Sequence, residues 1–377
     1  MASIEKRVRN GRSRWYIRYR DPSGNQRTKT FDRRIDGERY LTTVESAKLA
    51  GSYTDPRRAA VTIGEFANKW QAAQAHLKPS TRERYAGLLR THVAPRWSSV
   101  RLSDVGHADV QAWVSELAET RSPSVAIKAH RVLSLVLSLA VRDGRIIRNP
   151  ADGIGLPREV QKNRRFLTHQ QVQALAHAAG SDGLVILFLA YTGVRFGEMA
   201  ALRVERLDLL RRQVEIAESV TAVNGVLVWG TPKGHNRRWV SLPRFVADAL
   251  AEHVARMGPE DLVFLSRGRG VLRASNFRRD VWDAAVGAIG LDGVVPHGLR
   301  HTAASLAIAA GADVKVVQQM LGHKSATMTL DLYGHLFENR LDEVAERLDA
   351  AARASGDVYA TPATNVVELA RRRQAER

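Results

Sequence analysis

The sequence predicts a multidomain, mainly α protein with a small β-rich N-terminal domain, a helical bundle, and a mixed α+β, mostly helical C-terminal domain. Two observations lead to this prediction. The chain has 377 residues, and domains usually run about 100 to 200 residues, so two or three are expected. The apolar residues repeat with a period of two near the N-terminus, and with mostly helical spacing beyond residue 60.

Residues 1–60 are predicted to form a small sheet and one helix. Trp15, Ile17 and Tyr19 alternate with more polar residues, as in a half-buried strand. Turn chemistry in Asp21-Pro-Ser-Gly24 leads to a return strand over Gln26–Phe31, and a helix is expected over Ile35–Ala50.

The open face of this sheet is rich in arginine. Arg14, Arg18 and Arg20 alternate with the apolar residues, so they should share the solvent side. We expect them to bind a DNA groove. The alternative is an ordinary solvated face.

Residues 61–149 are predicted to be a helical bundle, with four amphipathic segments. These segments lie at Ile63–Trp70, from Pro79 through Leu89, from Leu102 to about Glu119, and at Ser124–Val141. Asn149-Pro150 ends the bundle, since a residue before proline avoids the helix. Gly153, Gly155 and Pro157 mark residues 150–165 as an extended linker.

Residues 166–350 are predicted to form the C-terminal domain. Thr168-His-Gln-Gln171 has the pattern of a capping box that opens a helix. Strands are expected at Gln213–Ala217, Val226–Trp229 and Arg237–Leu242 among helices. Residues 351–377 read as a tail, in which Asn365–Leu369 could dock on a neighbouring protomer.

The composition narrows the class of partner. The net charge is +18, and residues 1–60 hold 15 Lys and Arg against 7 Asp and Glu, which favours a polyanion. The chain has no cysteine, which excludes disulfides, thiolate metal sites and a cysteine nucleophile. The longest apolar run, Leu184–Tyr191, is far shorter than the roughly 18 residues of a membrane span, so no membrane partner is expected.

Five short stretches of the C-terminal half carry candidate chemistry. They are Thr192-Gly-Val-Arg195-Phe-Gly-Glu198, Thr231-Pro-Lys233, Pro296-His297-Gly-Leu-Arg300-His301-Thr302, Leu321-Gly-His323 and Leu332-Tyr333-Gly-His335. Each alone has an ordinary explanation: Arg195 as a surface ion-pair partner, Lys233 as a solvated hairpin residue, Tyr333 as core packing.

Together these residues suit a phosphate whose charge rises during reaction. Pro296 is expected in the first turn of a helix, which would place His297 and Arg300 beside unpaired amide groups and the positive end of the dipole. Arg195 could meet the same anion. Fixed cationic donors aimed at developing charge are worth roughly 3–4 kcal/mol each.

A nucleophile and two proton carriers complete the set. Tyr333 is the candidate nucleophile, and a neighbouring histidine could take its proton. A sugar hydroxyl is a poor leaving group that needs a general acid, and Lys233 could supply the proton. No carboxylate pair suited to a metal accompanies these residues.

In order, spacing and context, these motifs resemble the tyrosine recombinase, or phage integrase, family over about residues 165–345. The region 61–149 looks like the family's core-site DNA-binding domain. Residues 1–60 look, more loosely, like the arm-type DNA-binding domain of lambda-type integrases.

The resemblance implies a role for each matching residue. Arg195 and Arg300 would clamp the scissile phosphate, Tyr333 would form a 3′-phosphotyrosine, and Lys233 would protonate the leaving 5′ oxygen. His297 would assist proton transfer at the tyrosine, and His323 would hydrogen-bond a phosphate oxygen. Glu198 and His301 would be supporting residues, as would His335.

The resemblance also implies partners and a setting. We expect double-stranded DNA attachment sites, a homotetramer that exchanges strands through a Holliday junction, a host DNA-bending protein and an excisionase or other directionality factor. Neither a cofactor nor a metal is expected. The function would be integration, and excision, of a phage or other mobile element in the cytoplasm of a bacterial host, near the nucleoid.

Four alternatives remain open. One is a tyrosine recombinase of another role, in transposition, dimer resolution or inversion, although resolvases typically lack a module like residues 1–60. The others are a type IB topoisomerase, a DNA-binding protein with a dead site, and a zinc site at His297 and His301.

Overall fold

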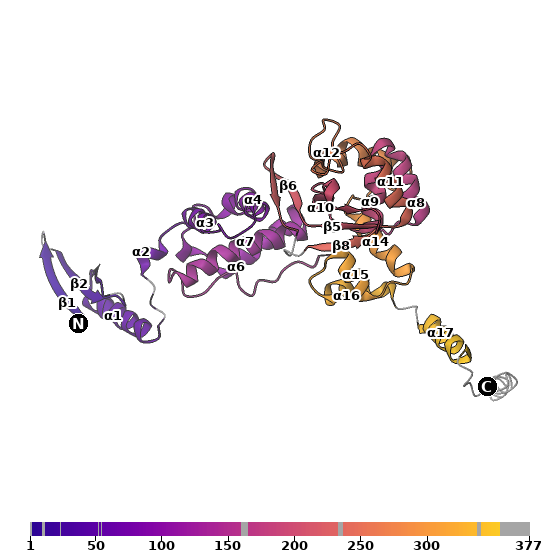
Figure 1. The fold of residues 1–377 in the computed structure, drawn as a ribbon. Coiled ribbons are helices and arrows are strands. Elements are labelled where there is room, and N and C mark those ends of the chain that lie inside the picture. Colours follow the sequence, from indigo (N-terminus) through magenta and orange to yellow (C-terminus); the bar gives the residue numbers. More distant parts are fainter. Residues whose placement is uncertain are drawn as a thin grey trace, which may run out of the picture. The chain divides into compact units, whose positions relative to one another are not determined.

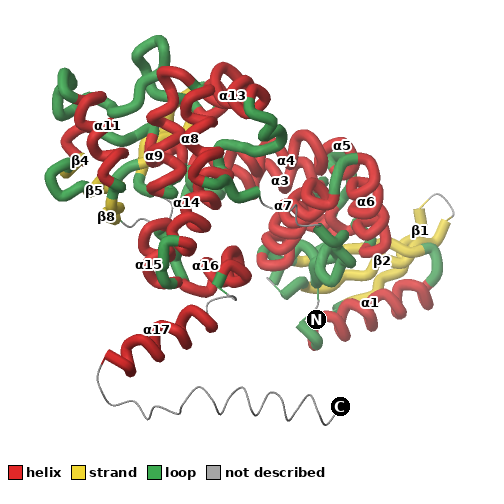
Figure 2. Tube along the Cα trace, turned by 90° about the vertical axis from the view of Figure 1, so that its right-hand side faces the viewer, coloured by secondary structure: helices red, strands yellow, loops and turns green. Residues whose placement is uncertain are grey.

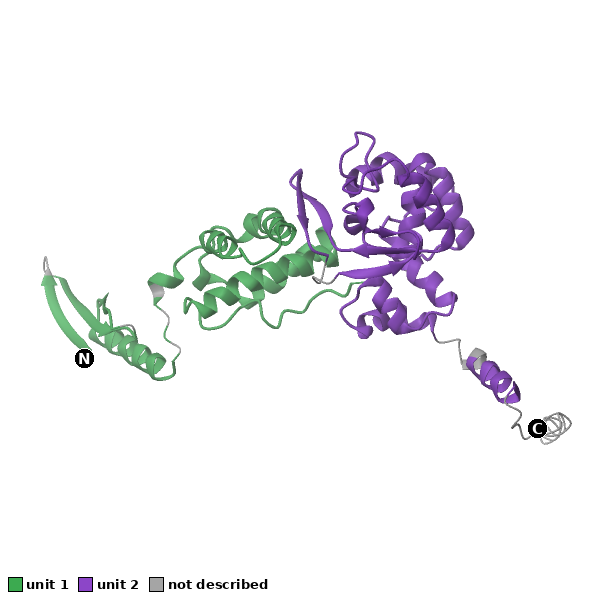
Figure 3. Ribbon diagram, in the orientation of Figure 1, with its two compact units in different colours: residues 1–162 green, residues 163–377 purple. Residues whose placement is uncertain are grey.

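The computed structural model describes residues 2–9, 12–22, 24–51, 53, 55–159, 165–232, 237–337 and 341–354. The chain divides into two compact units, residues 1–162 and 163–377 (Figure 3). Lys233 and the tail segment Asn365–Leu369 lie outside the described residues. The mainly α architecture predicted from the sequence is confirmed, with helices dominating both units (Figure 2).

The N-terminal sheet has three antiparallel strands in the order β1-β2-β3, namely β1 (Ser3–Arg9), β2 (Arg12–Arg20) and β3 (Gln26–Phe31). Helix α1 (Arg34–Leu49) covers the face that carries Ile17 (Figure 1). Gly37 permits this close packing, because a Cβ there would lie 2.5 Å from Ile17 Cδ1. The predicted return strand is therefore confirmed, and the predicted helix lies one residue earlier than expected.

Strand β1 is missing from the sequence prediction. Its register pairs Ile4 with Ile17 and Lys6 with Trp15. Lys6 occupies a position where alternation would call for an apolar residue, and its ammonium lies 5.9 Å from the centre of the Trp15 ring. A long cationic side chain can cover apolar surface in this way, which hides the strand pattern.

The rest of the first unit is helical. Its elements are α2 (Pro56–Ala59), α3 (Ile63–Ala72), α4 (Pro79–Leu88), a π-helical turn (Leu89–Val93), α5 (Ala94–Trp97), a 3₁₀ turn (Leu102–Asp104), α6 (His107–Thr120) and α7 (Pro123–Arg142). Thr62 and Glu65 form a capping box at the start of α3. Within the described part of the chain, α7 is long and apolar enough to cross a membrane, and it forms the centre of the bundle core, with Val132 and Leu133 fully buried.

The second predicted helix is longer than its apolar stripe indicated. It continues from α4 through the π-helical turn into α5. Pro95 has no amide hydrogen to donate into the preceding turn, and its ring crowds the carbonyl four residues earlier. A π-helical turn directly before it relieves both problems.

The first part of the predicted linker packs on the bundle. Gln111 binds Gly155 through both its amide oxygen and its amide nitrogen, at 2.8 and 3.1 Å. His130 Nε2 lies 2.8 Å from the carbonyl oxygen of Ala151. Because Ala151 and Ile154 are both buried, this segment belongs to the bundle core.

The second unit contains helices and two small sheets. The helices are α8 (His169–Ala178), α9 (Gly183–Thr192), α10 (Phe196–Met199), α11 (Arg244–Val254), α12 (Ala274–Phe277), α13 (Asp283–Ala288), α14 (Gly298–Ala309), α15 (Val314–Leu321), α16 (Ala326–Tyr333) and α17 (Leu341–Ala354). One sheet has the order β4-β5-β8, with β4 (Leu207–Asp208), β5 (Gln213–Ile216) and β8 (Arg238–Ser241), and the other pairs β6 (Ser219–Val223) with β7 (Val226–Gly230).

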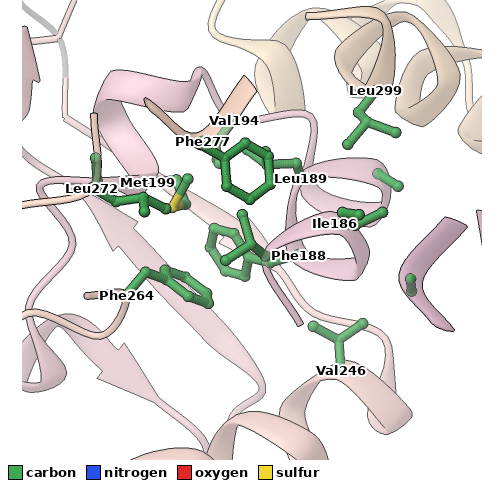
Figure 4. Close-up of a cluster of buried hydrophobic side chains, with 14 of the residues drawn as sticks. Ile186, Phe188, Leu189, Val194, Met199, Val246, Phe264, Leu272, Phe277 and Leu299 are labelled. Atoms are coloured by element: carbon green, nitrogen blue, oxygen red, sulfur yellow. The ribbon is translucent and has the colours of Figure 1, made fainter. Parts of the chain in front are cut away.

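Helix α9 is the centre of this unit. It packs against α8, α11 and α14. Its buried side chains Ile186, Phe188 and Leu189 lie in the core with Phe264 and Phe277 (Figure 4). The helix is apolar on all sides, as a central buried helix should be.

The structure confirms some of the short sequence patterns in this unit and adds a strand that was not predicted. The capping box at Thr168 and Gln171 is confirmed. Strand β6 was missed, and with it the fact that β7 pairs only with β6 rather than joining the larger sheet. Asn224-Gly225 forms the turn between them, with φ of 50° and 80°. An Asn-Gly pair between two apolar runs is a strong hairpin signal that could have identified β6.

Candidate functional site

Arg195 is held at the start of a helix. Helix α9 ends at Thr192, Gly193 turns the chain in the left-handed conformation at φ 65°, and Arg195 is the N-cap of α10. Glu198, at the third position of that helix, accepts a hydrogen bond from the Arg195 amide at 3.1 Å and pairs with its guanidinium at 2.9 Å. The arginine side chain stays about a quarter exposed, at 25%.

Arg300 is the buried cation of the site. It lies on α14 and is only 4% exposed. Its guanidinium donates to the carbonyl oxygens of Gly193 and Leu321, both at 2.6 Å. Those carbonyls belong to the C-terminal ends of α9 and α15, where the helix dipole favours a cation. Burial, and then the charge of Arg195, lower the pKa of Arg300 to about 9, so it remains charged at neutral pH.

The expected anion site at free amides before Arg300 is not present. The helix begins at Gly298 with His297 as its N-cap, so Pro296 lies outside it. The amides of Gly298, Leu299 and Arg300 already donate to the carbonyls of residues 295 to 297, at 2.7 to 3.2 Å. A tight turn that begins before the helix uses these donors, so anion binding has to come from side chains.

Tyr333 is the last residue of α16 and is 1% exposed. It packs in a cluster with Ala304, Ile308 and Leu321. Its hydroxyl lies 2.8 Å from Nδ1 of His301, on α14. The tyrosine is therefore both a core residue and a partner of a titratable group.

His301 makes the contact with Tyr333 that the resemblance implied for His297. The His297 ring lies edge-on against the His301 ring, with 5.4 Å between their centres. His301 is one turn further along α14 and contacts the Tyr333 hydroxyl directly. The direct contact with Tyr333 therefore belongs to a histidine that the sequence had predicted to be a supporting residue.

His323 follows the C-terminal cap of α15. Gly322 takes the left-handed conformation at φ 65°, which turns the chain so that His323 Nδ1 lies 3.0 Å from the hydroxyl of Thr329. Burial, and then the charges of Arg300 and Arg195, lower the pKa of His323 to about 4. At neutral pH it is an uncharged imidazole that can donate one hydrogen bond.

Glu198 joins the site to a residue that the sequence analysis missed. Its carboxylate is 2% exposed and also pairs with Arg238, at 2.6 Å. Burial alone would raise the pKa of Glu198, but the hydrogen bond and charge of Arg238, together with Arg195, hold that pKa below its usual range. Arg238 opens strand β8, where alternation places it on the same side as buried Val240, a signal that could have identified it.

The structure brings together the side chains of Arg195, Arg300, His301, His323 and Tyr333. They come from α10, α14, the end of α15 and α16. These side chains are close enough to interact electrostatically, since the charges of Arg195, Arg300 and His301 all lower the pKa of His323. Such a set can hold a tetrahedral anion and deliver a hydroxyl to it.

The three N-terminal arginines share one face of their sheet. Arg14, Arg18 and Arg20 lie on the side of β2 opposite α1. Glu5 of β1 is on the same face, 3.2 Å from Arg18 and 2.9 Å from Arg7. The Glu5 carboxylate therefore contacts two guanidiniums, and the Asp32 carboxylate lies 3.7 Å from Arg14.

Comparison with known proteins agrees with these features. A model of the phage integrase family matches residues 165–340, and a model of the phage integrase central domain matches residues 63–155. The prophage phiRv2 integrase of Mycobacterium tuberculosis is 28% identical over 355 residues, which cover 90% of this chain and 93% of that protein.

Two solved structures share the fold. The Tn1549 transposon integrase in complex with transposon right end DNA has a TM-score of 0.68 at 22% identity, covering 76% of this chain and 99% of that one. A lambda integrase tetramer bound to a Holliday junction has a TM-score of 0.55 at 18% identity, covering 85% of this chain and 96% of that one.

Proposed function

The chain belongs to the phage integrase family of tyrosine recombinases, and from this membership we propose that it is a site-specific integrase that cuts and rejoins DNA through a 3′-phosphotyrosine. The observation that carries the proposal is the Tyr333 hydroxyl, which is hydrogen-bonded to His301 beside the buried Arg300. A tyrosine next to a base and a cation is the arrangement that activates a hydroxyl nucleophile.

The proposed cleavage step forms one bond to phosphorus and breaks another. The Tyr333 oxygen attacks phosphorus and its proton passes to Nδ1 of His301. The bond from phosphorus to the 5′ oxygen breaks, and that oxygen takes a proton from Lys233. The reverse sequence, with the 5′ hydroxyl of another strand, rejoins the DNA.

Proton removal is the reason that Tyr333 needs His301. An ordinary tyrosine has a pKa of about 10, so only about one part in a thousand is ionised at pH 7. A base within hydrogen-bond reach typically contributes about 10²–10⁴-fold. Nδ1 can accept only in the tautomer that carries the ring proton on Nε2.

The proposed phosphate clamp consists of Arg195, Arg300 and His323. Arg300 donates two of its five N–H groups to backbone carbonyls. These bonds fix the plane of its guanidinium and leave the other donors for a phosphate oxygen. His323, as a neutral imidazole, adds a donor without adding charge. The phosphotyrosine keeps the energy of the phosphodiester, so the chemistry requires no ATP.

We further propose that the N-terminal sheet and the helical bundle hold DNA while the C-terminal domain cuts it. By analogy with the lambda integrase tetramer on a Holliday junction, four protomers would exchange strands between two duplexes, in the bacterial cytoplasm near the nucleoid. A host DNA-bending protein and an excisionase would set the direction of the reaction.

The likeness to the Tn1549 transposon integrase favours one second candidate, in which the mobile element is a transposon rather than a phage. The two differ in the DNA that is joined. The sequence of the element's ends, compared with its empty insertion site, separates them.

The experiment is covalent trapping on nicked DNA. A duplex that carries the element's attachment site, with a nick close to the cleavage position, loses a short fragment after attack and leaves the protein bound to DNA. We expect an adduct stable to denaturation, linked to Tyr333. A protein that instead relaxes any supercoiled plasmid without such a site would be a topoisomerase.

A further inference from the structure

We infer that Arg238 is a positioning residue for strand cleavage, which holds Glu198, and through it Arg195, in the geometry that clamps the phosphate. The inference rests on the proposed function. Arg238 lies at the start of β8, and its contacts connect that strand to α10 and to the end of α15.

The carboxylate of Glu198 is shared by two arginines. Glu198 pairs with Arg195 through Oε1, at 2.9 Å, and with Arg238 through Oε2, at 2.6 Å. The Arg238 side chain is 11% exposed and that of Glu198 is 1% exposed, so solvent cannot replace either partner cheaply. If Arg238 were lost, Oε2 would keep only the hydrogen bond from the Arg195 amide, and the Arg195 guanidinium could close onto both oxygens in a bidentate pair. Its donors would then face Glu198 instead of the phosphate.

Arg238 also contacts the end of α15. Arg238 Nε donates to the carbonyl oxygen of Met320 at 3.3 Å, and Arg300 donates to the next carbonyl, that of Leu321, at 2.6 Å. Two guanidiniums therefore hold two consecutive carbonyls directly before Gly322. A Cβ on Gly322 would lie 3.1 Å from Arg238 Cζ, which shows how closely the arginine lies against the turn that carries His323.

Arg238 is itself restrained by the strand on which it lies. Arg238 pairs with Ile216 in the register of β5 and β8, and Val240, two residues on, is buried. A guanidinium on a paired strand is restrained more strongly than one on a loop. Its charge also reaches both Arg300 and His323, whose pKa values it helps to lower, after larger effects from burial and from nearer charges.

The chemistry requires arginine at this position. The carboxylate of Glu198 and the carbonyl of Met320 are reached by different nitrogens, NH2 and Nε. A lysine is a compact point charge and cannot present two donors in a fixed plane. Arg238→Lys should therefore keep the charge, and much of the volume, yet slow cleavage.

The chain supplies a matched control in the preceding residue. Arg237 has a side chain that is 69% exposed and reaches Glu215 only at 3.7 Å. Arg237→Ala removes the same charge from the same stretch of chain without touching Glu198. Comparing the two positions separates positioning from general electrostatic attraction to DNA.

The experiment measures single-turnover cleavage of nicked attachment-site DNA at saturating full-length protein. We expect Arg238→Ala to lower the rate constant about 100-fold or more and Arg238→Lys about 10-fold or more, a range typical for the loss of one transition-state donor. Arg237→Ala should stay within about 3-fold, since exposed ion pairs contribute little. DNA affinity, measured with each substitution in the Tyr333→Phe background, should change less than about 3-fold.

A second substrate tests whether the effect passes through the clamp. A methylphosphonate at the cleaved position carries a methyl group in place of the charged non-bridging oxygen, so it needs little help from Arg195. The penalty of Arg238→Ala should shrink on this substrate in parallel with that of Arg195→Ala. A penalty of equal size on both substrates, or cleavage by Arg238→Lys at the wild-type rate, would overturn the inference.

Failure of the proposed function is distinct from these outcomes. If the wild-type protein forms no Tyr333-dependent adduct, the proposed function itself fails. If it forms one and the Arg238 variants cleave at the rate of Arg237→Ala, only the inference fails. Because Arg238→Lys retains charge and size, it keeps the test valid even where Arg238→Ala unfolds.

Discussion

Nδ1 of His301 lies 2.8 Å from the hydroxyl of Tyr333, across the contact between α14 and α16. Both residues lie on helices rather than on a loop; His301 is partly buried and Tyr333 is almost fully buried. The proposed nucleophile and its proposed base are therefore positioned by the same packing that stabilises this end of the domain. This relationship decides which histidine should matter most for removing the tyrosine's proton.

Replacing His301 should impair cleavage more than replacing His297. We expect His301→Asn to slow single-turnover adduct formation about 10²–10⁴-fold, the usual contribution of a positioned base. Asparagine places its amide where Nδ1 was, so the Tyr333 hydroxyl keeps a hydrogen-bond partner and the fold is spared. A His297→Asn variant slower than His301→Asn would return the role of base to His297.

Tyr333→Phe should abolish the covalent adduct while DNA binding stays within about 3-fold. One hydrogen bond is lost, which typically costs 0.5–1.5 kcal/mol, so we expect a small decrease in thermal stability. Tyr191→Phe is the matched control, because that hydroxyl lies at the same distance, 2.8 Å, from Nδ1 of His169 in the same unit. An adduct formed by Tyr333→Phe would show that the nucleophile is another residue.

The sequence predicted what depends on short-range pattern. The capping box at Thr168 and the strand over Gln26–Phe31 both follow from a few adjacent residues. Strand β1 was not predicted, because Lys6 takes an apolar position by lying over Trp15. Strand β6 is five residues long, and the Asn-Gly turn that follows it is its one clear sequence signal.

The sequence indicated the candidate residues of the site, but not which of them contact one another. His297 and His301 are four residues apart on one helix face, so spacing alone cannot tell which one meets Tyr333. Arg238 pairs with Glu198 across 40 residues of chain, a contact that depends on how β8 packs. The free amides expected after Pro296 are absent because the turn before α14 uses them.

Gly193→Ala should reduce both stability and cleavage. The residue sits at φ 65°, and a Cβ would lie 2.6 Å from Leu321 Cδ2. Its carbonyl also accepts from Arg300, so a shift there disturbs the clamp. Gly290→Ala is the control, since it has the same φ of 65° with open space around the added carbon. The strain common to both is about 1 kcal/mol, and any further loss in Gly193→Ala measures the clash.

Acidification should destabilise the DNA-free protein partly through His323. Its pKa falls from an ordinary 6.5 to about 4 on folding, so between these values the unfolded chain binds more protons than the folded one. Stability then drops as the pH falls through that window. We expect His323→Asn to lose less stability than the wild type between pH 7 and pH 5, by on the order of 1 kcal/mol, a reduced figure because the side chain is partly open to solvent. Urea unfolding at the two pH values measures this difference, and equal losses would contradict it.

The open face of the N-terminal sheet should bind DNA through its arginines. A protein that neutralises phosphates releases counterions, so the logarithm of its affinity falls linearly with the logarithm of salt concentration, and each lost contact lowers the slope by about 1. We expect Arg14→Ala, Arg18→Ala and Arg20→Ala each to reduce the slope by about that amount on DNA that carries the distal sites of the element, in full-length protein with Tyr333→Phe. Arg39→Ala is the control, because Arg39 is exposed on α1, which covers the opposite face of the sheet. If all four substitutions change the slope equally, the sheet contributes only net charge, and the arginine face is an ordinary solvated surface.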